Sequence, residues 1–314
     1  MNETEQPLNP WIHRMAIVTA VVAMLPIIMG ALTTTKEAGM AFPDWPTSDG
    51  QGMFSYPWLK LVDDMSTNNE SVKKFLEHGH RLAGTLAGFA SLILMVLTWM
   101  KGSNKTLGIL GILVFLAVCI QGALGGIRVE LNDRGLAMLH GIFAAMYFSL
   151  VCVTASVSST TWNQWKPEET NRPVKAARNA SLIYLVFLLV QYTLGGIIRH
   201  PMGDMKAPVN EHLGFGILAL IAVHVVLVFV VKTKVNWLRS AMRGVIILTA
   251  IQVVLGFVTY ATKFGAFGIR VVEGSTGQVL SRTSHMVVGL LLVASATVLT
   301  VRCFRVYRLM KTNS

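Results

Sequence analysis

The sequence predicts an all-α integral membrane protein whose eight transmembrane helices form two tandem four-helix bundles. Two observations predict this class. The 314 residues are 53% hydrophobic and only 14% charged, whereas a soluble domain usually carries about 25% charged residues. The apolar residues also gather in eight long runs, several of which end in a similar motif, and such internal repetition indicates duplicated helical units.

Each apolar run is long enough to cross a bilayer, because a hydrocarbon core about 30 Å thick needs about 20 apolar residues in a helix. No clean small-residue cleavage site follows the first run, so we expect an uncleaved helix and not a signal peptide. The expected spans are 15–34, 79–100, 107–127, 136–158, 179–198, 212–231, 244–262 and 285–301.

Basic residues indicate how the helices are oriented. Lys and Arg cluster in short loops between the runs, as in Lys232, Lys234, Arg239 and Arg243, and loops of this kind typically face the cytoplasm. We therefore expect a multi-pass protein of the cell (inner) membrane with both termini cytoplasmic. Because the net charge of +11 is distributed in this way, we expect no nucleic-acid partner.

The repeated endings divide the chain into four helical hairpins, and the helix that follows each ending begins near a histidine. We expect an N-terminal four-helix half over 11–158 and a C-terminal half over 175–311, with the glycines of the endings allowing close helix contact. The endings are "PIIMGA" (26–31), "QGALGGIR" (121–128), "QYTLGGIIR" (191–199) and "QVVLGF" (252–257).

Four histidines occupy equivalent places at the outer ends of the even-numbered spans, namely His80, His140, His212 and His285. Each is followed four residues later by Gly or Ala, on the same helix face, which leaves a notch beneath the imidazole. A flat ligand held edge-on by imidazoles, such as haem, suits this pattern, with one bis-imidazole site in each half. A zinc or di-metal site suits it less well because further ligands are lacking.

The other four histidines lack this register. A single intramembrane histidine often serves only to hydrogen-bond a neighbouring helix. We expect His13 to be an interfacial anchor, His78 to face solvent or headgroups, and His224 to be structural, whereas His200 could contact a haem propionate.

Three segments resemble the haem A synthase family of membrane proteins, which mature cytochrome oxidase. They are "GMAFPDWP" (39–46) in the long outer loop, "EHGHR" (77–81), and "GGIIRH" (195–200). The resemblance implies conversion of haem O to haem A by two successive hydroxylations of the C8 methyl group and loss of water. It implies substrate haem between His80 and His140, and a haem b cofactor between His212 and His285, toward the outer face.

The resemblance also implies partners. These are haem O and its synthase, a farnesyl transferase, together with the cytochrome oxidase assembly machinery, membrane lipid and an electron acceptor that the sequence does not identify. One feature departs from many bacterial members, because the segment 39–50 contains no cysteine. Any thiol-based step or disulfide in this loop is therefore absent.

Glu77 is the predicted catalytic residue. It precedes His80 by three residues and shares its helix face, whereas the residue three before His212 is the apolar Val209. A carboxylate there could exchange a proton with the substrate or stabilise developing positive charge. It could instead serve the helix N-terminus or pair with Arg81.

Four arginines lie at outer span ends and are candidate propionate contacts, because guanidinium groups suit carboxylates, although interfacial snorkelling would place them similarly. They are Arg81, Arg128, Arg199 and Arg282. Two other functions stay open beside the enzyme. A bis-haem b electron carrier would use the same histidines without needing Glu77, and a haem-delivery or oxidase-assembly protein would bind haem without altering it.

Overall fold

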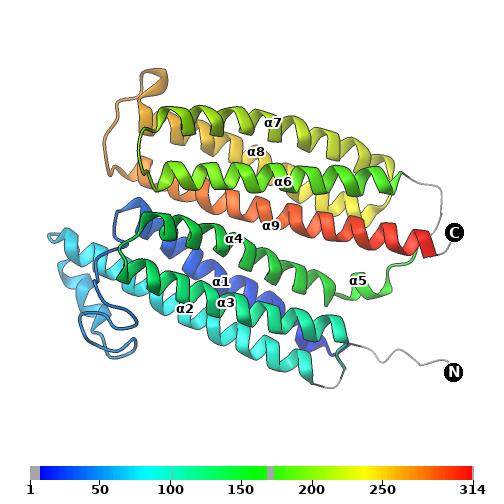
Figure 1. Cartoon of the computed structure of the whole chain (residues 1–314), viewed down its shortest axis with the longest axis horizontal. Helices are drawn as coiled ribbons and strands as arrows, with labels where there is room; N and C mark the ends of the chain where they lie inside the picture. Colours follow the sequence, from blue (N-terminus) through cyan, green and yellow to red (C-terminus); the bar gives the residue numbers. More distant parts are fainter. Residues whose placement is uncertain (1–7, 101, 168–172, 313–314) are drawn as a thin grey trace. The chain divides into compact units, whose positions relative to one another are not determined.

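The computed structural model describes residues 8–100, 102–167 and 173–312, and its long helices are shown in Figure 1. Eight helices in these ranges are long and apolar enough to cross a membrane, and no strand occurs among the described residues. The helices are α1 (Pro10–Thr35), α2 (Asn69–Trp99), α3 (Lys105–Glu130), α4 (Arg134–Val157), α6 (Val174–Arg199), α7 (Lys206–Lys232), α8 (Asn236–Phe264) and α9 (Thr276–Thr312). The all-α prediction and the eight spans are confirmed.

Most of the helices run past the apolar runs that predicted them. Helix α9 begins at Thr276, although the apolar run begins at 285, because polar residues such as Gln278 continue the same helix. Three short helices complete the described elements. They are η1 (Trp58–Asp64), α5 (Thr160–Gln164) and η2 (Ala266–Gly268).

The chain divides into two compact units. The first contains the described residues up to Thr33, the segment Ala38–Asn132 and the segment Met146–Trp165; the remainder forms the second. The beginning of α4, which carries His140, therefore groups with the second unit. The functional halves 11–158 and 175–311, and the two four-helix bundles, stay predictions.

In the first unit, α2 packs against α3 and against η1. A Cβ on Gly111 of α3 would overlap the side chain of Thr98 on α2, so glycine permits this close approach. Helix α1 also lies along α2, because the hydroxyl of Thr19 donates to the carbonyl of Ala90 at 3.3 Å. Hydroxyls can make such bonds between helices without adding bulk.

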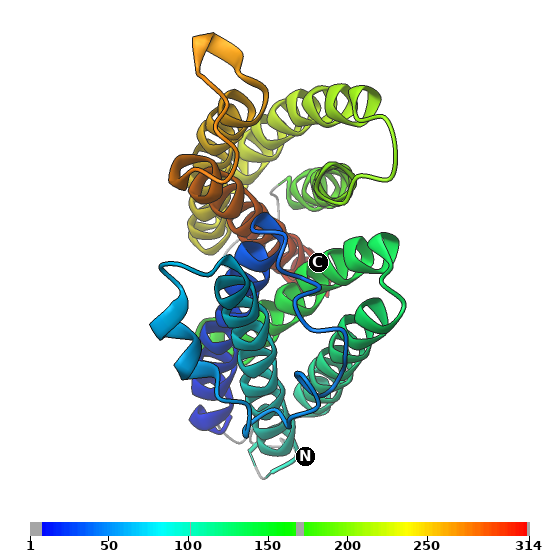
Figure 2. The same ribbon diagram turned by 90° about the vertical axis from the view of Figure 1, so that its left-hand side faces the viewer.

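The loop between α1 and α2, residues 36–68 and hereafter the first loop, lies at the N-terminal end of α2. In Figure 2 it is drawn in blue at the end of the unit that faces the viewer. Trp58 of η1 donates its indole N–H to the carbonyl of Phe75 at 2.8 Å, and the two rings stack with centroids 4.6 Å apart. The first loop is thus an ordered structure against α2.

In the second unit, α6 packs against α7 and α9, and α8 packs against α9. The hydroxyl of Tyr184 on α6 lies 3.3 Å from that of Thr249 on α8, and Thr300 of α9 donates to the carbonyl of Ser181 on α6 at 3.2 Å. Helix α6 thus contacts both α7, which carries His212, and α9, which carries His285.

Candidate functional site

Three of the four predicted histidines sit against a glycine of the preceding long helix. An added Cβ would lie 2.8 to 3.3 Å from the ring carbon Cε1 in each pair, so a larger residue would press on the imidazole. The pairs are Gly30 with His80, Gly195 with His212, and Gly256 with His285. The glycines of the repeated endings therefore seat the imidazoles, which is a more specific role than the helix contact that the sequence predicted.

A backbone carbonyl four residues before the glycine lies beside the same ring. His80 Nδ1 is 2.9 Å from the carbonyl oxygen of Pro26. Because that oxygen can only accept, Nδ1 carries the proton, and Nε2 is the nitrogen that can coordinate a metal. Gln191 and Gln252 likewise lie four residues before the glycines that seat His212 and His285, but Nδ1 of these two histidines makes no hydrogen bond of normal geometry with any described residue. Histidine ligands typically make a second bond of this kind, which fixes the ring.

His212 and His285 face each other in the second unit. Their ring centroids are 6.3 Å apart and the ring planes are inclined by 80°. A metal–nitrogen bond of about 2 Å on each side, with the ring radii added, separates two imidazole centroids on opposite sides of one metal by about 6 Å. The observed spacing matches this value, and the binding of one iron by both histidines stays a prediction.

Glutamine side chains fill the notches of the second unit. Gln191 donates its amide N–H to the carbonyl of His212 at 2.9 Å, and the same nitrogen lies 3.4 Å from His212 Nε2. A Cβ on Gly216, four residues after His212, would meet this amide nitrogen at 3.2 Å. In the second notch, Gln252 Nε2 lies 3.4 Å from His285 Nε2 and 3.0 Å from a Cβ added at Gly289.

Buried polar atoms without partners surround this pair. Within the described part of the chain, the amide oxygens of Gln191 and Gln252 and the Nδ1 atoms of His212 and His285 make no hydrogen bond of normal geometry. Such atoms are uncommon in folded proteins and require an explanation. Two facing imidazoles beside unsatisfied amides fit a bis-imidazole haem site. Among the described residues, no group of three or more His, Cys, Asp or Glu could hold a metal ion.

Arginines of the second unit lie near these histidines in sequence. Arg199 ends α6 and interacts electrostatically with Arg282 of α9. Carboxylates bind guanidinium groups well. The arrangement suits the predicted contact with haem propionates.

His80 of the first unit differs from the second-unit pair in the helix face below it. An added Cβ on Gly84 or Gly88 would meet nothing within 4 Å, so the notch predicted there is open. His80 belongs to the first unit and His140 to the second, and the pairing of these two histidines around one haem stays a prediction.

Glu77 is fully buried and its carboxylate is shared among three donors. Oε2 accepts the backbone N–H of Ala41 at 2.6 Å and that of Phe42 at 3.2 Å. Oε1 accepts Arg81 Nη2 at 2.9 Å. Both oxygens are thus used by the first loop and by Arg81. The pairing with Arg81 was one of the alternatives considered from the sequence, and the acid–base role of Glu77 stays a prediction.

Arginines of the first unit lie against the first loop. Arg81 Nη1 donates to the carbonyls of Asp44 at 2.8 Å and Thr47 at 2.6 Å. The guanidinium of Arg128 lies beside Gly39, 2.9 Å from an added Cβ. Arg81 therefore already has carbonyl and carboxylate partners, and the propionate contacts of Arg81 and Arg128 stay predictions.

His78 does not face solvent or headgroups, and that prediction is wrong. It is fully buried, its Nδ1 lies 2.9 Å from the hydroxyl of Ser48, and its ring lies 4.8 Å from that of Tyr56. Because His78 is two residues before His80, the sequence correctly places it on a different side of the helix. It could not reveal that the first loop folds over this side of α2.

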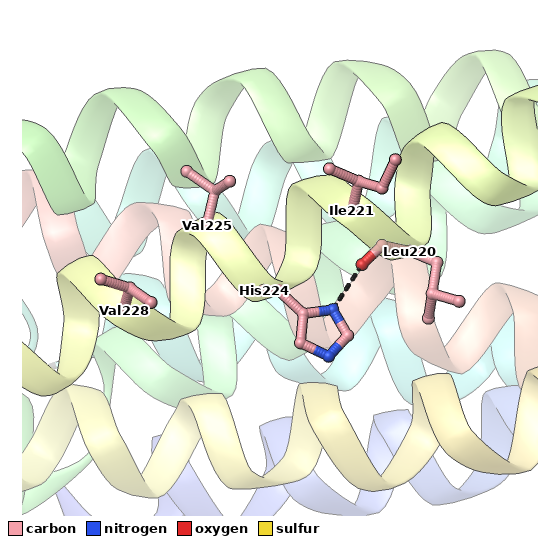
Figure 3. Close-up of a pocket in the computed structure, with 5 residues that line it drawn as sticks. All are labelled: Leu220, Ile221, His224, Val225 and Val228. Carbon is pink, nitrogen blue, oxygen red and sulfur yellow. Dashed lines mark hydrogen bonds between the residues drawn. The ribbon is translucent and has the colours of Figure 1, made fainter.

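His224 lies on an exposed face of α7, shown with its neighbours in Figure 3. Its Nδ1 is 2.6 Å from the carbonyl of Leu220 one turn earlier, and the shallow hollow around it is otherwise lined by aliphatic side chains. His13 lies 3.0 Å from the carbonyl of Ala155. The contact of His224 agrees with a structural role, and the expectation that His13 is an interfacial anchor stays a prediction.

Comparisons with known proteins point to one family. The COX15-CtaA family model, described as cytochrome oxidase assembly protein, matches residues 13–212, a range that includes Glu77, His80, His140 and His212. The chain is 29% identical to a heme A synthase of Beijerinckia indica over 57% of this chain and 55% of the relative. It is 24% identical to a heme A synthase of Shouchella clausii over 62% and 60%.

The match extends to a mammalian protein, since the chain is 28% identical to heme A synthase COX15 of Bos taurus over 54% of this chain and 48% of the relative. In all three comparisons the chain spans about half of the relative's length, or slightly more. His285 lies beyond the residues matched by the family model, so its assignment depends on the repeat and on its geometry with His212.

Proposed function

This chain is a multi-pass membrane protein of the COX15-CtaA family of cytochrome oxidase assembly proteins, and we propose that it is a haem A synthase. It would oxidise the C8 methyl group of haem O to a formyl group through two successive hydroxylations and loss of water. The heme A synthases among its relatives support this class of reaction. The product would be used in cytochrome c oxidase biogenesis.

In this proposal His212 and His285 hold a resident haem b, and the 6.3 Å separation of their rings is the observation that carries it. Gly195 and Gly256 seat the two rings. Bound haem b would supply one-electron redox chemistry. Arg199 and Arg282 would neutralise its propionates.

His80 and His140 are proposed to bind the substrate haem O. The Pro26 carbonyl holds the proton on His80 Nδ1 and so presents Nε2 as the ligand. The open face at Gly84 and Gly88 supports a flat occupant beside α2. Val209 stands where a second Glu77 would be, which favours chemistry in the N-terminal part of the chain alone.

The membrane placement is part of the same proposal. The clusters of Lys and Arg support a location in the inner membrane with both termini in the cytoplasm and both haem sites toward the outer face. A farnesyl transferase in the same membrane would supply haem O, and the oxidase assembly machinery would receive the product. The electron acceptor is unidentified.

The experiment that tests this proposal is expression of the chain with a source of haem O, followed by extraction and mass analysis of the porphyrins. We expect a formyl-bearing product, together with haem b in the purified protein. A His224→Ala variant is the matched control, because this histidine lies on α7 with His212 but bonds only its own helix in the structure. Recovery of unmodified haem O and haem b alone would contradict the proposal.

One observation favours the two alternative functions, an electron carrier and a haem-delivery protein. The Glu77 carboxylate is occupied by the first loop and Arg81, and neither an electron carrier nor a haem-delivery protein needs it for chemistry. Both would give haem b without a formyl product in the same experiment. A carrier would in addition be reduced by a quinol, which stopped-flow absorption can measure.

A further inference from the structure

Four side chains at the N-terminal end of α2 bind the first loop. Two of them are adjacent, and each of these two lies three or four residues from the other two, so all four lie on one side of the helix. They are Lys74, Glu77, His78 and Arg81. His80 and the open glycines below it lie beside this face.

We infer that Glu77 and Arg81, hereafter the loop clamp, are positioning residues that fix segment 38–50 of the first loop on α2. Glu77 is fully buried, and a buried carboxylate requires donors for its oxygens. Two of its three donors are consecutive backbone N–H groups, those of Ala41 and Phe42. A carboxylate bound in this way fixes the backbone of the segment and not merely one side chain.

Arg81 makes the second half of the clamp. Its side chain is only 6% exposed, and its guanidinium joins the Glu77 carboxylate to the carbonyls of Asp44 and Thr47. A planar guanidinium with several donors can bridge such groups, whereas a lysine ammonium is a single point charge. The clamp therefore holds both the N–H groups at 41–42 and the carbonyls at 44 and 47.

The neighbouring contacts agree with this assignment. Phe42 is fully buried, and the cationic groups of Arg81 and Lys74 lie 5.2 and 5.4 Å from its ring centre. Lys74 also pairs with Asp49 of the loop at 2.6 Å. These contacts surround the ion pair of Glu77 and Arg81 with packed groups, which reduces its exposure to water and strengthens it.

The clamp would act on haem chemistry through the loop. It ties segment 38–50 to the helical turn that carries His80, so it fixes the surroundings of that ligand. In this respect the inference rests on the proposed function, because the clamp bears on the reaction only if His80 binds a haem. It assigns Glu77 an effect on the site that does not require proton transfer.

Hydrogen–deuterium exchange of the purified full-length protein tests the clamp directly. We expect Glu77→Ala to speed exchange of the Ala41 and Phe42 amides about tenfold or more, because both lose their acceptor. Glu77→Gln should restore most of the protection, since its amide oxygen can accept the same two N–H groups. Glu70→Ala is the matched control, because Glu70 is an exposed carboxylate on the same helix.

Two further measurements keep the outcome decisive. Exchange in α8 and α9 reports whether a variant remains folded, and Arg81→Lys provides a milder change that should also speed exchange in 38–50. Unchanged exchange in both Glu77→Ala and Arg81→Lys, or a Glu77→Gln variant as unprotected as Glu77→Ala, would overturn the inference. Haem A formation by the unmodified chain is assayed separately, so failure of the proposed function would be distinguished from failure of the clamp.

Discussion

The histidine near the N-terminal end of α2 is held in the same way as the histidines of α7 and α9, but its surroundings differ from theirs. In each case, a glycine of the preceding long helix seats an imidazole. Around His80 the notch is open and a loop is bound to the adjacent helix face, whereas around His212 a glutamine fills the notch. Under the proposed function, both kinds of site hold a haem, and their different surroundings go with different roles.

The difference is physical and not only a matter of sequence. The first site has a buried ion pair and an ordered loop beside its histidine, as suits a site that must control access to a reacting group. The second has two histidines facing each other and amide groups on both sides, as suits a site that retains its occupant. Under the proposed function these are the substrate site and the cofactor site.

Removing a second-unit ligand should produce the largest effect. His212→Ala or His285→Ala leaves one imidazole where two are needed, so we expect nearly all resident haem b to be lost. Visible absorption and haem content per protein measure this loss. His224→Ala should keep the spectrum unchanged, and a spectrum insensitive to both ligand variants would refute the assignment of the cofactor site.

Replacing His80 should separate the two sites. We expect His80→Ala to lower the rate of haem A formation by about a hundredfold or more, because this ligand positions the substrate under the proposed function. Haem b should remain bound to the second unit. Mass analysis of extracted porphyrins and the absorption spectrum are measured on one sample. Simultaneous loss of haem b would show that the His80 site and the site of His212 and His285 do not bind haem independently.

A change in the glycine seat should have a moderate effect. Gly195→Val would press on His212, whose Cε1 lies 3.3 Å from an added Cβ, and such overpacking costs about 1–3 kcal/mol. We expect a lower thermal transition and weaker haem b retention. Gly122→Val in α3 is the control because its Cβ would meet nothing within 4 Å; equal effects of the two changes would argue against a specific seat.

The smallest expected effect is a pH dependence at the tip of the first loop. Burial raises the pKa of Asp44, but hydrogen bonds from the Thr47 side chain and the N–H groups of Gly50 and Asp49 outweigh it, so its pKa lies below its ordinary 3.8. A depressed carboxyl pKa stabilises the loop above the unfolded value, and this contribution is lost as the pH falls through the folded pKa.

The measurement is protection of the Asp49 and Gly50 amides relative to their intrinsic exchange rates. Protection should hold down to about pH 4 and decrease below it. Asp44→Asn should remove this pH dependence, because the amide does not titrate. A pH dependence that persists in Asp44→Asn would assign the effect to another group.

The spans could be predicted because membrane helices must satisfy their backbone internally and present about 20 apolar residues to lipid. Helix ends were less predictable. Thr276 to Ser284 are mostly polar, yet they continue α9 beyond its apolar run. Hydropathy detects the part of a helix inside the membrane and not the part that extends beyond it.

The histidine register could also be predicted, because the repeat places residues of one type at equivalent helix ends. Gln191 and Gln252 could have been identified as equivalent residues, since both begin a repeated ending. The direction of their side chains, and hence the filling of the notches, cannot be predicted from one sequence. The burial of His78 and the loop bonds of Glu77 depend on contacts between residues 20 or more positions apart. Periodicity carries no information about such contacts.

The residue at the start of each repeated ending has a consequence for turnover. Gln191 and Gln252 place an amide beside the imidazole of the next helix, whereas Pro26 offers His80 only a carbonyl. A haem leaving His212 or His285 would be followed by an amide that can take its place, so a second haem would have to displace this amide before it could bind. At His80 the residue in this position is Pro26, which has no side-chain amide to take the place of a departing porphyrin; under the proposed function this difference suits an exchangeable substrate.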